Sequence, residues 1–513
     1  MRGNRLKIMK LTNNGLTDVT AWEDKGYFLP KYDRALVKKN TMENPEWIHF
    51  GAGNIFRAFQ AKVVEDLLND SVNGEAIINT GLIVAEGYDY EIVEKMNRPH
   101  DDLSILVTLK ADKTVEKTVV GSIVESCILD ENNEKEIGRL KEIFSKPSLK
   151  MVSFTITEKG YKTFAYMSKV TKLLYERYKN GAYPVAFVSM DNCSHNGDKL
   201  KEAVLEISEK FVSEGLFEKG FIEYINDVNK VSFPLSMIDK ITPRPDGNIE
   251  KLLMDDGIED LETVITEKKT YVAPFVNAEE TEYLVIEDLF PNGKLPLDKK
   301  GIIYTNRETV DKTEKMKVCT CLNPLHTALA IFGCLLGHTS IHEEMNDEVL
   351  KRMVEKLGYE EGIKVVVDPK VLSPVEFLDA VLTKRLPNPY MPDTPQRIAC
   401  DTSQKLPIRF GETVKAYRSS EVLSTDDLNI IPLVYAGYLK YLNGIDDDGN
   451  KFELSPDPLL EELCKLAPKE VLKRQDVFGV DLFEDSLGEK ALNIYNEMLD
   501  GIGAVRKTLN KYV

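Results

Sequence analysis

The sequence predicts an α/β domain with a mostly parallel sheet, followed by a mainly α-helical C-terminal domain. A short apolar segment at 47–50 leads into Gly51-Ala-Gly53 and then into a segment with helical periodicity at 59–68. This order of strand, glycine turn and helix is typical of a Rossmann-like βαβ unit. Apolar segments alternate with helical ones up to residue 307, and long helical periods dominate from 308 onward. Because 513 residues exceed a single hydrophobic core, we predict two domains, 1–307 and 308–513.

Each element of the first domain is predicted from its own pattern. Residues 1–46 show no sustained period, and we expect an irregular lead-in there. Strands are expected at 47–50, 81–85, 150–157 and 184–189, a helix at 163–179, and short strands that extend the sheet near 272–276 and 283–286. Apolar strands alternating with helices indicate a parallel sheet that is covered on both faces.

The second domain is predicted to be built from helices. Its apolar residues recur with the spacing of one helix face, which is the pattern of packed amphipathic helices. The expected helices are 308–336, 345–356, 375–383, 427–443, 457–466 and 487–510.

Composition and charge exclude several classes of partner. The formal net charge is -18, and no block of Lys and Arg is long enough to follow a phosphate backbone, which argues against nucleic acid. No run of 18 apolar residues predicts a membrane span, and no apolar segment follows the basic N-terminus as in a secretory signal. We expect a cytoplasmic protein that acts on small molecules, as a monomer or a small homo-oligomer.

The cysteines predict free thiols and no metal site. There are seven, an odd and scattered set that fits a reducing compartment. Cys319 and Cys321 lie close in sequence, but no neighbouring Cys or His completes the spacing of zinc ligands.

The glycine turn is the first candidate site, for a dinucleotide coenzyme. Gly51 permits a tight turn, and Gly53 lets the backbone approach a pyrophosphate at the helix N-terminus. Asn54 and Ile55 continue the turn, and Phe56 stands where the usual fingerprint has a third glycine. An ordinary strand-to-helix turn would explain the same residues.

Polar residues follow three of the predicted strands. Glu86 ends the second strand, where an acidic side chain can accept a hydrogen bond from a ribose 2′-hydroxyl. Its distance from the glycines exceeds the usual spacing of about 20 residues, so an insertion is required; a solvent-facing acid is the alternative. Thr157 and Glu158 follow the third strand and Asn192 follows the fourth, at the sheet edge where ligands bind in open α/β sheets.

The segment 315–330 is the candidate for catalysis. Lys317, Asn323 and His326 interrupt an otherwise apolar run, and the last two share one helix face. Burial disfavours the charged form of a lysine. A neutral amine beside an amide and an imidazole can take a proton from an alcohol and stabilise the oxygen that remains. A core helix with a few hydrogen-bonded polar residues is the alternative.

Seven motifs in order carry a resemblance to a known family. The segments 28–34, 49–60, 157–161, 191–197, 236–243, 322–326 and 397–407 together resemble the polyol-specific long-chain dehydrogenases, the mannitol dehydrogenase and hexuronate reductase family. Each motif is weak, but the ordered set is specific and covers most of the chain.

The resemblance implies a zinc-independent, NAD-dependent oxidoreductase. It assigns general-base catalysis to a lysine, oxyanion binding to two asparagines, substrate binding to a histidine, and the lining of the sugar pocket to an aspartate, an arginine and a lysine. The matching residues are Lys317, Asn192 and Asn323, His326, Asp239, Arg397 and Lys405. Within the family we favour the interconversion of a ketohexuronate and an aldonate, with D-fructuronate and D-mannonate as the preferred pair. Mannitol and tagaturonate are alternatives, and a catalytically silent sugar or nucleotide sensor is an alternative of another class.

One spacing departs from the family pattern. In the family the lysine and asparagine positions are usually five apart in sequence, whereas Lys317 and Asn323 are six apart. At 100° per residue an undistorted helix would turn Lys317 away from Asn323 and place Lys315 nearer the face of His326. A one-residue π-bulge would restore Lys317, and such bulges are frequent at functional sites. We therefore favour Lys317 as the base and keep Lys315 as the alternative.

Overall fold

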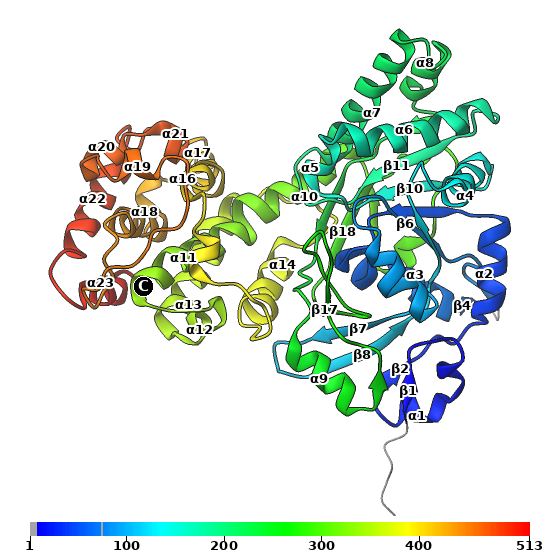
Figure 1. The fold of residues 1–513 in the computed structure, drawn as a ribbon. Helices are drawn as coiled ribbons and strands as arrows, with labels where there is room; N and C mark the ends of the chain where they lie inside the picture. Colours follow the sequence, from blue (N-terminus) through cyan, green and yellow to red (C-terminus); the bar gives the residue numbers. More distant parts are fainter. Residues whose placement is uncertain (1–7, 73–74) are drawn as a thin grey trace, which may run out of the picture. The chain divides into compact units, whose positions relative to one another are not determined.

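The computed structural model describes residues 8–72 and 75–513, which form two compact units. Unit 1 comprises the residues up to Leu109 together with Thr114–Val310, and unit 2 comprises Lys110–Lys113 and Asp311–Val513. Unit 1 contains the sheets, and unit 2 is built from helices (Figure 1). The predicted fold class is confirmed.

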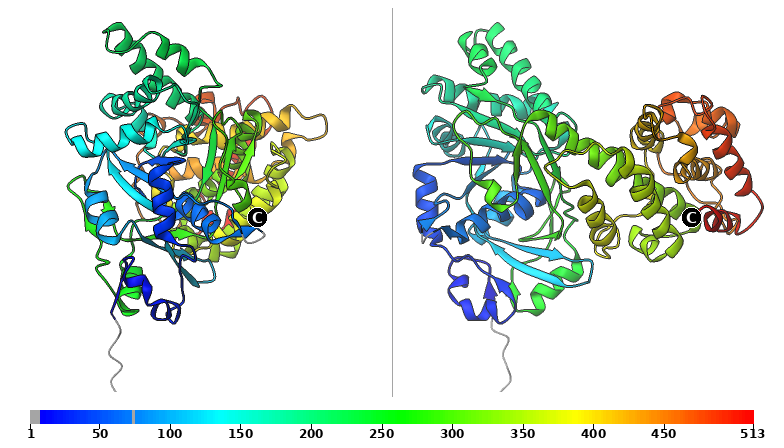
Figure 2. Two further views of the ribbon diagram at one scale, coloured as in Figure 1. Left: turned by 90° about the vertical axis from the view of Figure 1, so that its right-hand side faces the viewer. Right: turned by 180° about the vertical axis from the view of Figure 1, so that it is seen from behind.

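A six-stranded parallel sheet forms the centre of unit 1 (Figures 1 and 2). Its spatial order is β12-β11-β10-β3-β6-β9, and every neighbouring pair is parallel. The strands are β3 (Trp47–Phe50), β6 (Leu82–Glu86), β9 (Ile123–Ile128), β10 (Met151–Phe154), β11 (Val185–Ser189) and β12 (Val231–Ser232). The chain starts at β3, moves outward to β6 and β9, and then returns to β10 on the other side of β3. This reversal is the doubly wound order, and ligands bind beyond the carboxyl ends of the strands where it occurs.

The strands are apolar because both faces of the sheet are covered. All residues of β3, β6, β10 and β11 are buried. Phe50, Phe154 and Phe187 pack on one face, whereas Trp47 and Leu82 pack on the other. The surrounding helices are α3 (Ala61–Asn69), α4 (Glu134–Ser145), α5 (Thr157–Tyr161), α6 (Phe164–Lys179), α7 (Asn196–Ser213) and α8 (Gly220–Asn226).

The later strands of unit 1 differ from the prediction, because they form sheets of their own and do not extend the parallel one. One has the order β17-β7-β8-β2 and another the order β13-β18-β19. The bounds are β2 (Tyr27–Phe28), β7 (Ser104–Leu109), β8 (Val115–Val120), β13 (Ser236–Asp239), β17 (Phe275–Glu279), β18 (Tyr283–Glu287) and β19 (Ile303–Thr305). Pairs of short strands are β1 (Met9–Lys10) with β14 (Ile258–Glu259), β4 (Ser71–Val72) with β5 (Glu75–Ala76), and β15 (Val264–Ile265) with β16 (Tyr271–Val272).

The lead-in is more ordered than predicted. It contains β1, β2 and two helices, α1 (Val19–Glu23) and α2 (Arg34–Glu43). The side chain of Asp33 accepts a hydrogen bond from the backbone of Leu36 and so caps α2. Helix α2 was missed because few of its residues are buried: Val37 and Thr41 alone face the core.

Two buried helices, α11 (Asn323–Leu336) and α18 (Ile430–Tyr441), form the centre of unit 2. The buried carboxylate of Glu361 accepts hydrogen bonds from the backbone of Asn429, Ile430 and Ile431, which satisfies the free N–H groups at the start of α18. The other helices of more than one turn include α12 (Ile341–Asn346), α13 (Glu348–Glu355), α14 (Pro374–Ala380), α17 (Glu412–Arg418), α22 (Leu487–Glu497) and α23 (Ala504–Tyr512). Helix α10 (Arg307–Lys315) begins in unit 1 and ends in unit 2.

Six segments of the described residues have π-helical hydrogen bonding. They are η2 (Phe56–Gln60), η3 (Val93–Asn97), η6 (Met316–Cys321), η7 (Lys356–Gly362), η9 (Val381–Arg385) and η10 (Pro407–Gly411). The helix predicted at 487–510 is interrupted where Gly501 and Gly503 adopt positive φ angles of 92° and 79°.

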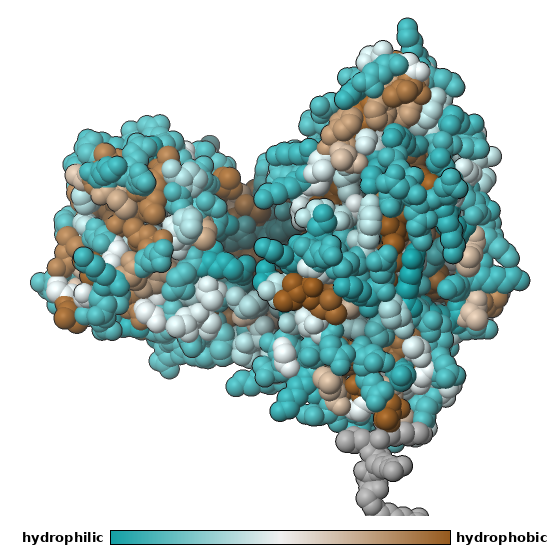
Figure 3. Space-filling view, in the orientation of Figure 1, coloured by the Kyte–Doolittle hydropathy of each residue, from teal (hydrophilic) through white to brown (hydrophobic). Residues whose placement is uncertain are grey.

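The surface in view is predominantly hydrophilic (Figure 3), as the charge of -18 leads one to expect. Among the described residues one helical stretch, Arg307–Leu336, is long and apolar enough to cross a membrane by length and composition. Inside the protein 78% of its most apolar window is buried, as in the core helix of a soluble protein. Within residues 8–72 and 75–513 no group of three or more His, Cys, Asp or Glu side chains could hold a metal ion.

Candidate active site

The turn after β3 has the two properties that a pyrophosphate requires. Gly51 has a φ of 108°, and a Cβ atom there would lie 2.4 Å from the carbonyl oxygen of Thr155. Only glycine fits that position. A Cβ atom on Gly53 would meet nothing within 4 Å, so the backbone faces open space at the start of the following helix. This opening fits a dinucleotide whose phosphates approach the N–H groups of the turn.

The residues after Gly53 contribute to the turn mainly through their backbone. Phe56 is fully buried and stacks on the imidazole of His49, with ring centres 3.9 Å apart. Its side chain therefore cannot meet a coenzyme. Ile55 is partly buried and packs against the same core. Asn54 accepts a hydrogen bond from the guanidinium of Arg57 at 2.9 Å.

Arg57 is a buried cation that sequence reasoning missed. It donates to Asn54 and, at 2.7 Å, to the carbonyl oxygen of Ala273. Burial lowers its pKa to about 10. Its position four residues after Gly53 was the available signal, since an arginine within the first turns of an apolar helix needs polar partners.

Glu86 has a different environment from the one predicted. It is buried at the end of β6, and one carboxylate oxygen accepts a hydrogen bond from the backbone of Ala52 at 2.9 Å. The other oxygen accepts from Tyr88 at 2.8 Å and from Asp89 at 3.1 Å. Burial raises its pKa, and these N–H groups oppose that rise. The carboxylate thus fastens the glycine turn to the loop after β6, and a contact with a ribose would add to this role.

The ends of β10 and β11 are fastened together by Asp191. Its carboxylate accepts hydrogen bonds from the backbone of Ile156 at 3.1 Å and of Thr157 at 2.8 Å, and from the hydroxyl of Tyr161. Thr157 has a φ of 65°, a left-handed conformation that is uncommon for a threonine. Such strain is frequent at ligand sites.

Of three further candidates of unit 1, two are exposed and one is buried. Glu158 is exposed and forms ion pairs with Lys199 and Lys162, which lower its pKa. Asn192 is exposed at the end of β11. Asp239 is buried at the end of β13.

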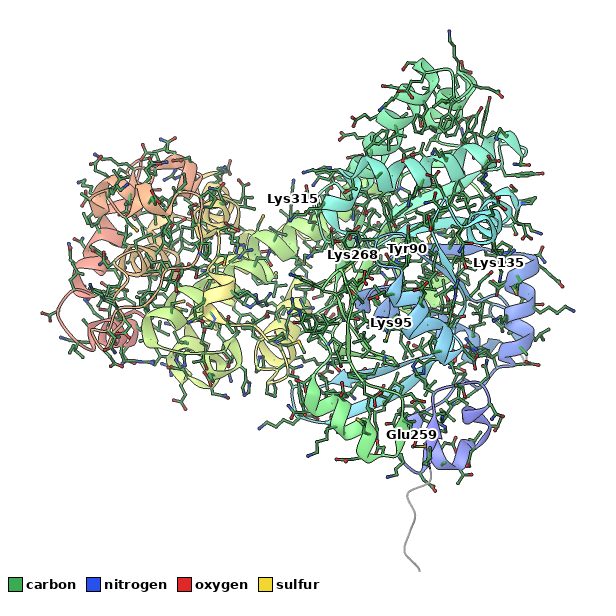
Figure 4. All side chains as sticks on the ribbon, viewed as in Figure 1. Tyr90, Lys95, Lys135, Glu259, Lys268 and Lys315 are labelled. Atoms are coloured by element: carbon green, nitrogen blue, oxygen red, sulfur yellow. The ribbon has the colours of Figure 1, made fainter. Side chains whose placement is uncertain are left out.

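A pocket of about 400 Å³ lies beside the loop after β6. One wall comes from that loop and another from the start of α6 and the turn before it; the third comes from the turn between β15 and β16. Three tyrosine rings, two lysines and three carboxylates line it: Tyr88, Tyr90, Tyr166, Lys169, Lys268, Asp89, Glu91 and Glu267. Figure 4 labels Tyr90 and Lys268, which belong to two of these walls. The hydroxyl of Tyr166 is buried and has no hydrogen-bond partner.

The candidate base lies in a π-helix of unit 2. The segment η6 covers Met316–Cys321, and the backbone N–H of Leu322 donates to the carbonyl oxygen of Lys317, five residues earlier, at 3.1 Å. Lys317 is buried, with 4% of its surface exposed, whereas Lys315 is exposed. Figure 4 labels Lys315 on this helical stretch. A new helix then begins at Asn323, with Pro324 in its first turn.

His326 is a mostly buried imidazole of α11 with an unused nitrogen. Its Nε2 atom lies 3.5 Å from the carboxylate of Asp393 and makes no hydrogen bond. Burial, and then four nearby cations, lower its pKa to about 3, so the ring is neutral at ordinary pH. In order of effect these cations are Arg409, Arg385, Arg397 and Lys405.

The cations around His326 differ in their own partners. Arg397 forms an ion pair with Asp393, and its side chain is 59% exposed. Lys405 donates to the backbone carbonyl oxygens of Ile398 and Cys400. Arg409 donates to the hydroxyl of Thr327 at 2.5 Å, and burial lowers its pKa to about 10. Sequence reasoning identified Arg397 and Lys405 but missed Arg385 and Arg409.

Family models match both parts of the chain. The mannitol dehydrogenase Rossmann domain matches residues 45–299, and the mannitol dehydrogenase C-terminal domain matches residues 309–499. The chain belongs to the mannitol dehydrogenase family. The family resemblance predicted from the ordered motifs is confirmed.

Relatives cover nearly the whole chain. The D-mannonate oxidoreductase of Thermotoga maritima is 48% identical, over 98% of this chain and 99% of its own length. The mannitol 2-dehydrogenase of Emericella nidulans is 27% identical, over 91% of this chain and 92% of its own. The chain is thus an oxidoreductase of this family, as predicted.

Two solved structures of dehydrogenases share the fold. A substrate-free D-sorbitol dehydrogenase has a TM-score of 0.77 at 23% identity and covers 94% of this chain and 97% of its own. A ternary complex of Pseudomonas fluorescens mannitol 2-dehydrogenase with NAD and D-mannitol has a TM-score of 0.67 at 24% identity, covering 98% and 99%. Both extend across the Rossmann-like and the helical parts.

Proposed function

We propose that this chain is an NAD-dependent oxidoreductase that interconverts D-fructuronate, a ketohexuronate, and D-mannonate, an aldonate. The end-to-end similarity to a D-mannonate oxidoreductase supports this choice within the family. The single observation that carries it in the structure is the set of four cations around the neutral His326 in unit 2.

The cations favour a substrate that bears a carboxylate. Two positive charges there, on Lys405 and Arg409, have hydrogen-bond acceptors that are neutral oxygens. Arg397 has Asp393 as its anionic partner, yet its guanidinium is largely exposed and can bind a second carboxylate. A polyol brings hydroxyl groups only and would add no negative charge to this group of cations.

The features of unit 1 support NAD as the coenzyme. Gly51 and Gly53 leave room for a pyrophosphate at the start of the helix, and Asn54, Ile55 and Phe56 offer their backbone there. The pocket beside Glu86 has the size and the aromatic lining that suit an adenosine. Thr157 and Glu158, at the end of β10, are proposed to line the coenzyme site on the far side of β3.

The residues of unit 2 are proposed to handle the proton. The hydride would be exchanged with NAD when the coenzyme is bound. The buried amine of Lys317 takes the proton from the substrate hydroxyl during oxidation and returns it during reduction. Asn323 donates a hydrogen bond to the oxygen as it becomes negative, and the unused Nε2 of His326 bonds a neighbouring substrate hydroxyl. In unit 1, we assign Asn192 to the binding of a developing oxyanion and Asp239 to a hydroxyl of the sugar.

The setting proposed for the enzyme is the cytoplasm. All seven cysteines are free thiols, four of them at least partly exposed, as a reducing compartment allows. We propose a monomer or small homo-oligomer whose partners are its sugar acid and its coenzyme, rather than nucleic acid or a membrane.

A substrate panel tests the proposal. Oxidation of NADH would be followed by absorbance with fructuronate, tagaturonate and fructose as alternative substrates. We expect fructuronate to give the highest kcat/KM. Faster turnover of tagaturonate or fructose would change the assigned substrate but not the type of reaction. If the protein binds the coenzyme but turns over none of the sugars, it would be a sensor.

A further inference from the structure

A hairpin outside the parallel sheet lies against the loop that follows β6. The antiparallel strands β15 and β16 pair Val264 with Val272 and Ile265 with Tyr271. Its turn is closed by the backbone hydrogen bond from Thr266 to Thr270 at 3.0 Å. Neither the motifs nor the central sheet account for this hairpin, which was not predicted.

Two hydrogen bonds join the hairpin to that loop. The hydroxyl of Thr266, which is buried, donates to the carboxylate of Asp89 at 2.6 Å. The backbone N–H of Glu267 donates to the carboxylate of Glu91 at 3.0 Å. The turn is therefore fixed to a loop nearly 180 residues earlier in the chain.

Lys268, the next residue of the hairpin, makes a third contact with the loop after β6. The ammonium of Lys268 lies 5.4 Å from the centre of the Tyr88 ring, within the range of a cation–π contact. Glu267 and Lys268 thereby become part of the wall of the 400 Å³ pocket. The adjacent Lys269 is absent from that wall, so two consecutive lysines differ in their access to the pocket.

Another wall of the pocket, at the start of α6, contains a hydroxyl without a hydrogen-bond partner. The hydroxyl of Tyr166 is buried without a hydrogen bond, although a buried hydroxyl normally has one. Gly87 makes room for this ring, because a Cβ atom there would lie 2.6 Å from it. The ammonium of Lys169 borders the same space and donates to the hydroxyl of Tyr90 at 3.2 Å.

We propose that the β15–β16 hairpin is a clamp over the adenosine half of the coenzyme, and that Lys268 sets coenzyme affinity. This inference rests on the proposed function, since it needs a dinucleotide in unit 1. A purine base is flat and aromatic and stacks on tyrosine rings, whereas a ribose and its phosphate take hydrogen bonds from an ammonium. The lining of the pocket includes both kinds of group.

The test measures binding and not turnover. NADH would be titrated by its fluorescence against the full-length protein and the variants Lys268→Gln, Thr266→Val and Lys269→Gln. We expect the first two to raise the Kd for NADH about tenfold, the loss typical of one hydrogen bond to a charged group. The matched control, Lys269→Gln, removes the same charge from the neighbouring position and should change the Kd less than twofold.

Two further measurements localise the effect. Displacement of NADH by AMP should be weakened by Lys268→Gln, and displacement by nicotinamide mononucleotide should not. Trypsin cleaves after lysine, so bound NADH should also slow cleavage after Lys268 and Lys269 in the wild-type protein. This second measurement stands even where Thr266→Val fails to fold.

The outcomes separate the two proposals. NADH binding that is unchanged in Lys268→Gln, or weakened equally in Lys269→Gln, overturns the clamp while the proposed function stands. A wild-type protein that binds neither NADH nor AMP overturns the proposed function and the clamp with it.

Discussion

Glu65 should make the stability of unit 1 depend on pH. This glutamate of α3 is fully buried, and it accepts hydrogen bonds from the hydroxyl of Tyr32 at 2.7 Å, the backbone of Gly121 at 2.8 Å and the amide of Asn69 at 3.1 Å. Burial raises its pKa from 4.5 to about 7, although these donors oppose the rise. The folded protein therefore holds a proton in the window between pH 4.5 and 7 that the unfolded chain releases.

The size of the effect follows from that window. The contribution of protonated Glu65 to the free energy of unfolding is fully present below pH 4.5 and is lost as the pH rises through 7. A shift of about 2.5 pKa units corresponds to about 3 kcal/mol, of which about 2 kcal/mol falls between pH 5.5 and 8. Glu65→Gln cannot ionise, so the variant should lack this loss.

Denaturant unfolding at pH 5.5 and pH 8 would measure it. The free energy of unfolding of Glu65→Gln, taken relative to wild type, should increase by about 2 kcal/mol from pH 5.5 to pH 8, because only the wild-type protein loses stability over that range. The comparison is a difference of differences, so other titrating groups cancel. A relative stability that does not change with pH would show that Glu65 is ionised in the folded protein at pH 5.5, and the reasoning would then be wrong.

The remaining predictions concern catalysis and specificity. Lys317→Ala should lower kcat by about 10²- to 10⁴-fold while NADH still binds by fluorescence, because the proton loses its acceptor; an active Lys317→Ala beside an inactive Lys315→Ala would reassign the base. Arg397→Ala should lower kcat/KM for fructuronate more than for fructose, and the difference should correspond to about 2 kcal/mol of transition-state stabilisation. Equal losses on both substrates would favour a polyol dehydrogenase. Steady-state kinetics should show a preference for NAD over NADP, since three carboxylates line the pocket proposed for adenosine; equal kcat/KM for the two coenzymes would contradict this expectation. Glu86→Gln should weaken binding of both coenzymes by turning an amide N–H toward backbone donors.

The elements that define the fold could be read from the sequence because their signal is local. The strand at Trp47–Phe50 was predicted at its observed bounds, and those near 82–86 and 185–189 within a residue. Each is an apolar run bounded by a turn, and the reversal of strand order next to β3 makes their carboxyl ends the ligand edge. Strand β9 was missed, since its sequence Ile123–Ile128 includes a glutamate and a serine that interrupt the apolar run.

The environment of the site residues could not be read in the same way. That Glu86 bonds three backbone N–H groups depends on the path of two separate loops, and no property of the residue itself reports it. The grouping of Arg385 and Arg409 near His326 likewise comes from tertiary packing. The hairpin at β15–β16 was missed because two-residue strands have almost no periodicity.

The π-helix at Met316–Cys321 also decides how this protein is to be compared with its relatives. A single extra residue inside a helical turn can be absorbed as a π-turn while the helices before and after it keep their places. A comparison of letters alone can put the compensating gap before or after Lys317, and only a gap after it pairs Lys317 with a lysine five residues before its asparagine. Superposition of backbones fixes the gap, because the bond from Leu322 to Lys317 marks where the extra residue sits. Equivalent lysines in two members of the family are therefore identified by the hydrogen-bond pattern of the helix and not by their sequence separation from the asparagine.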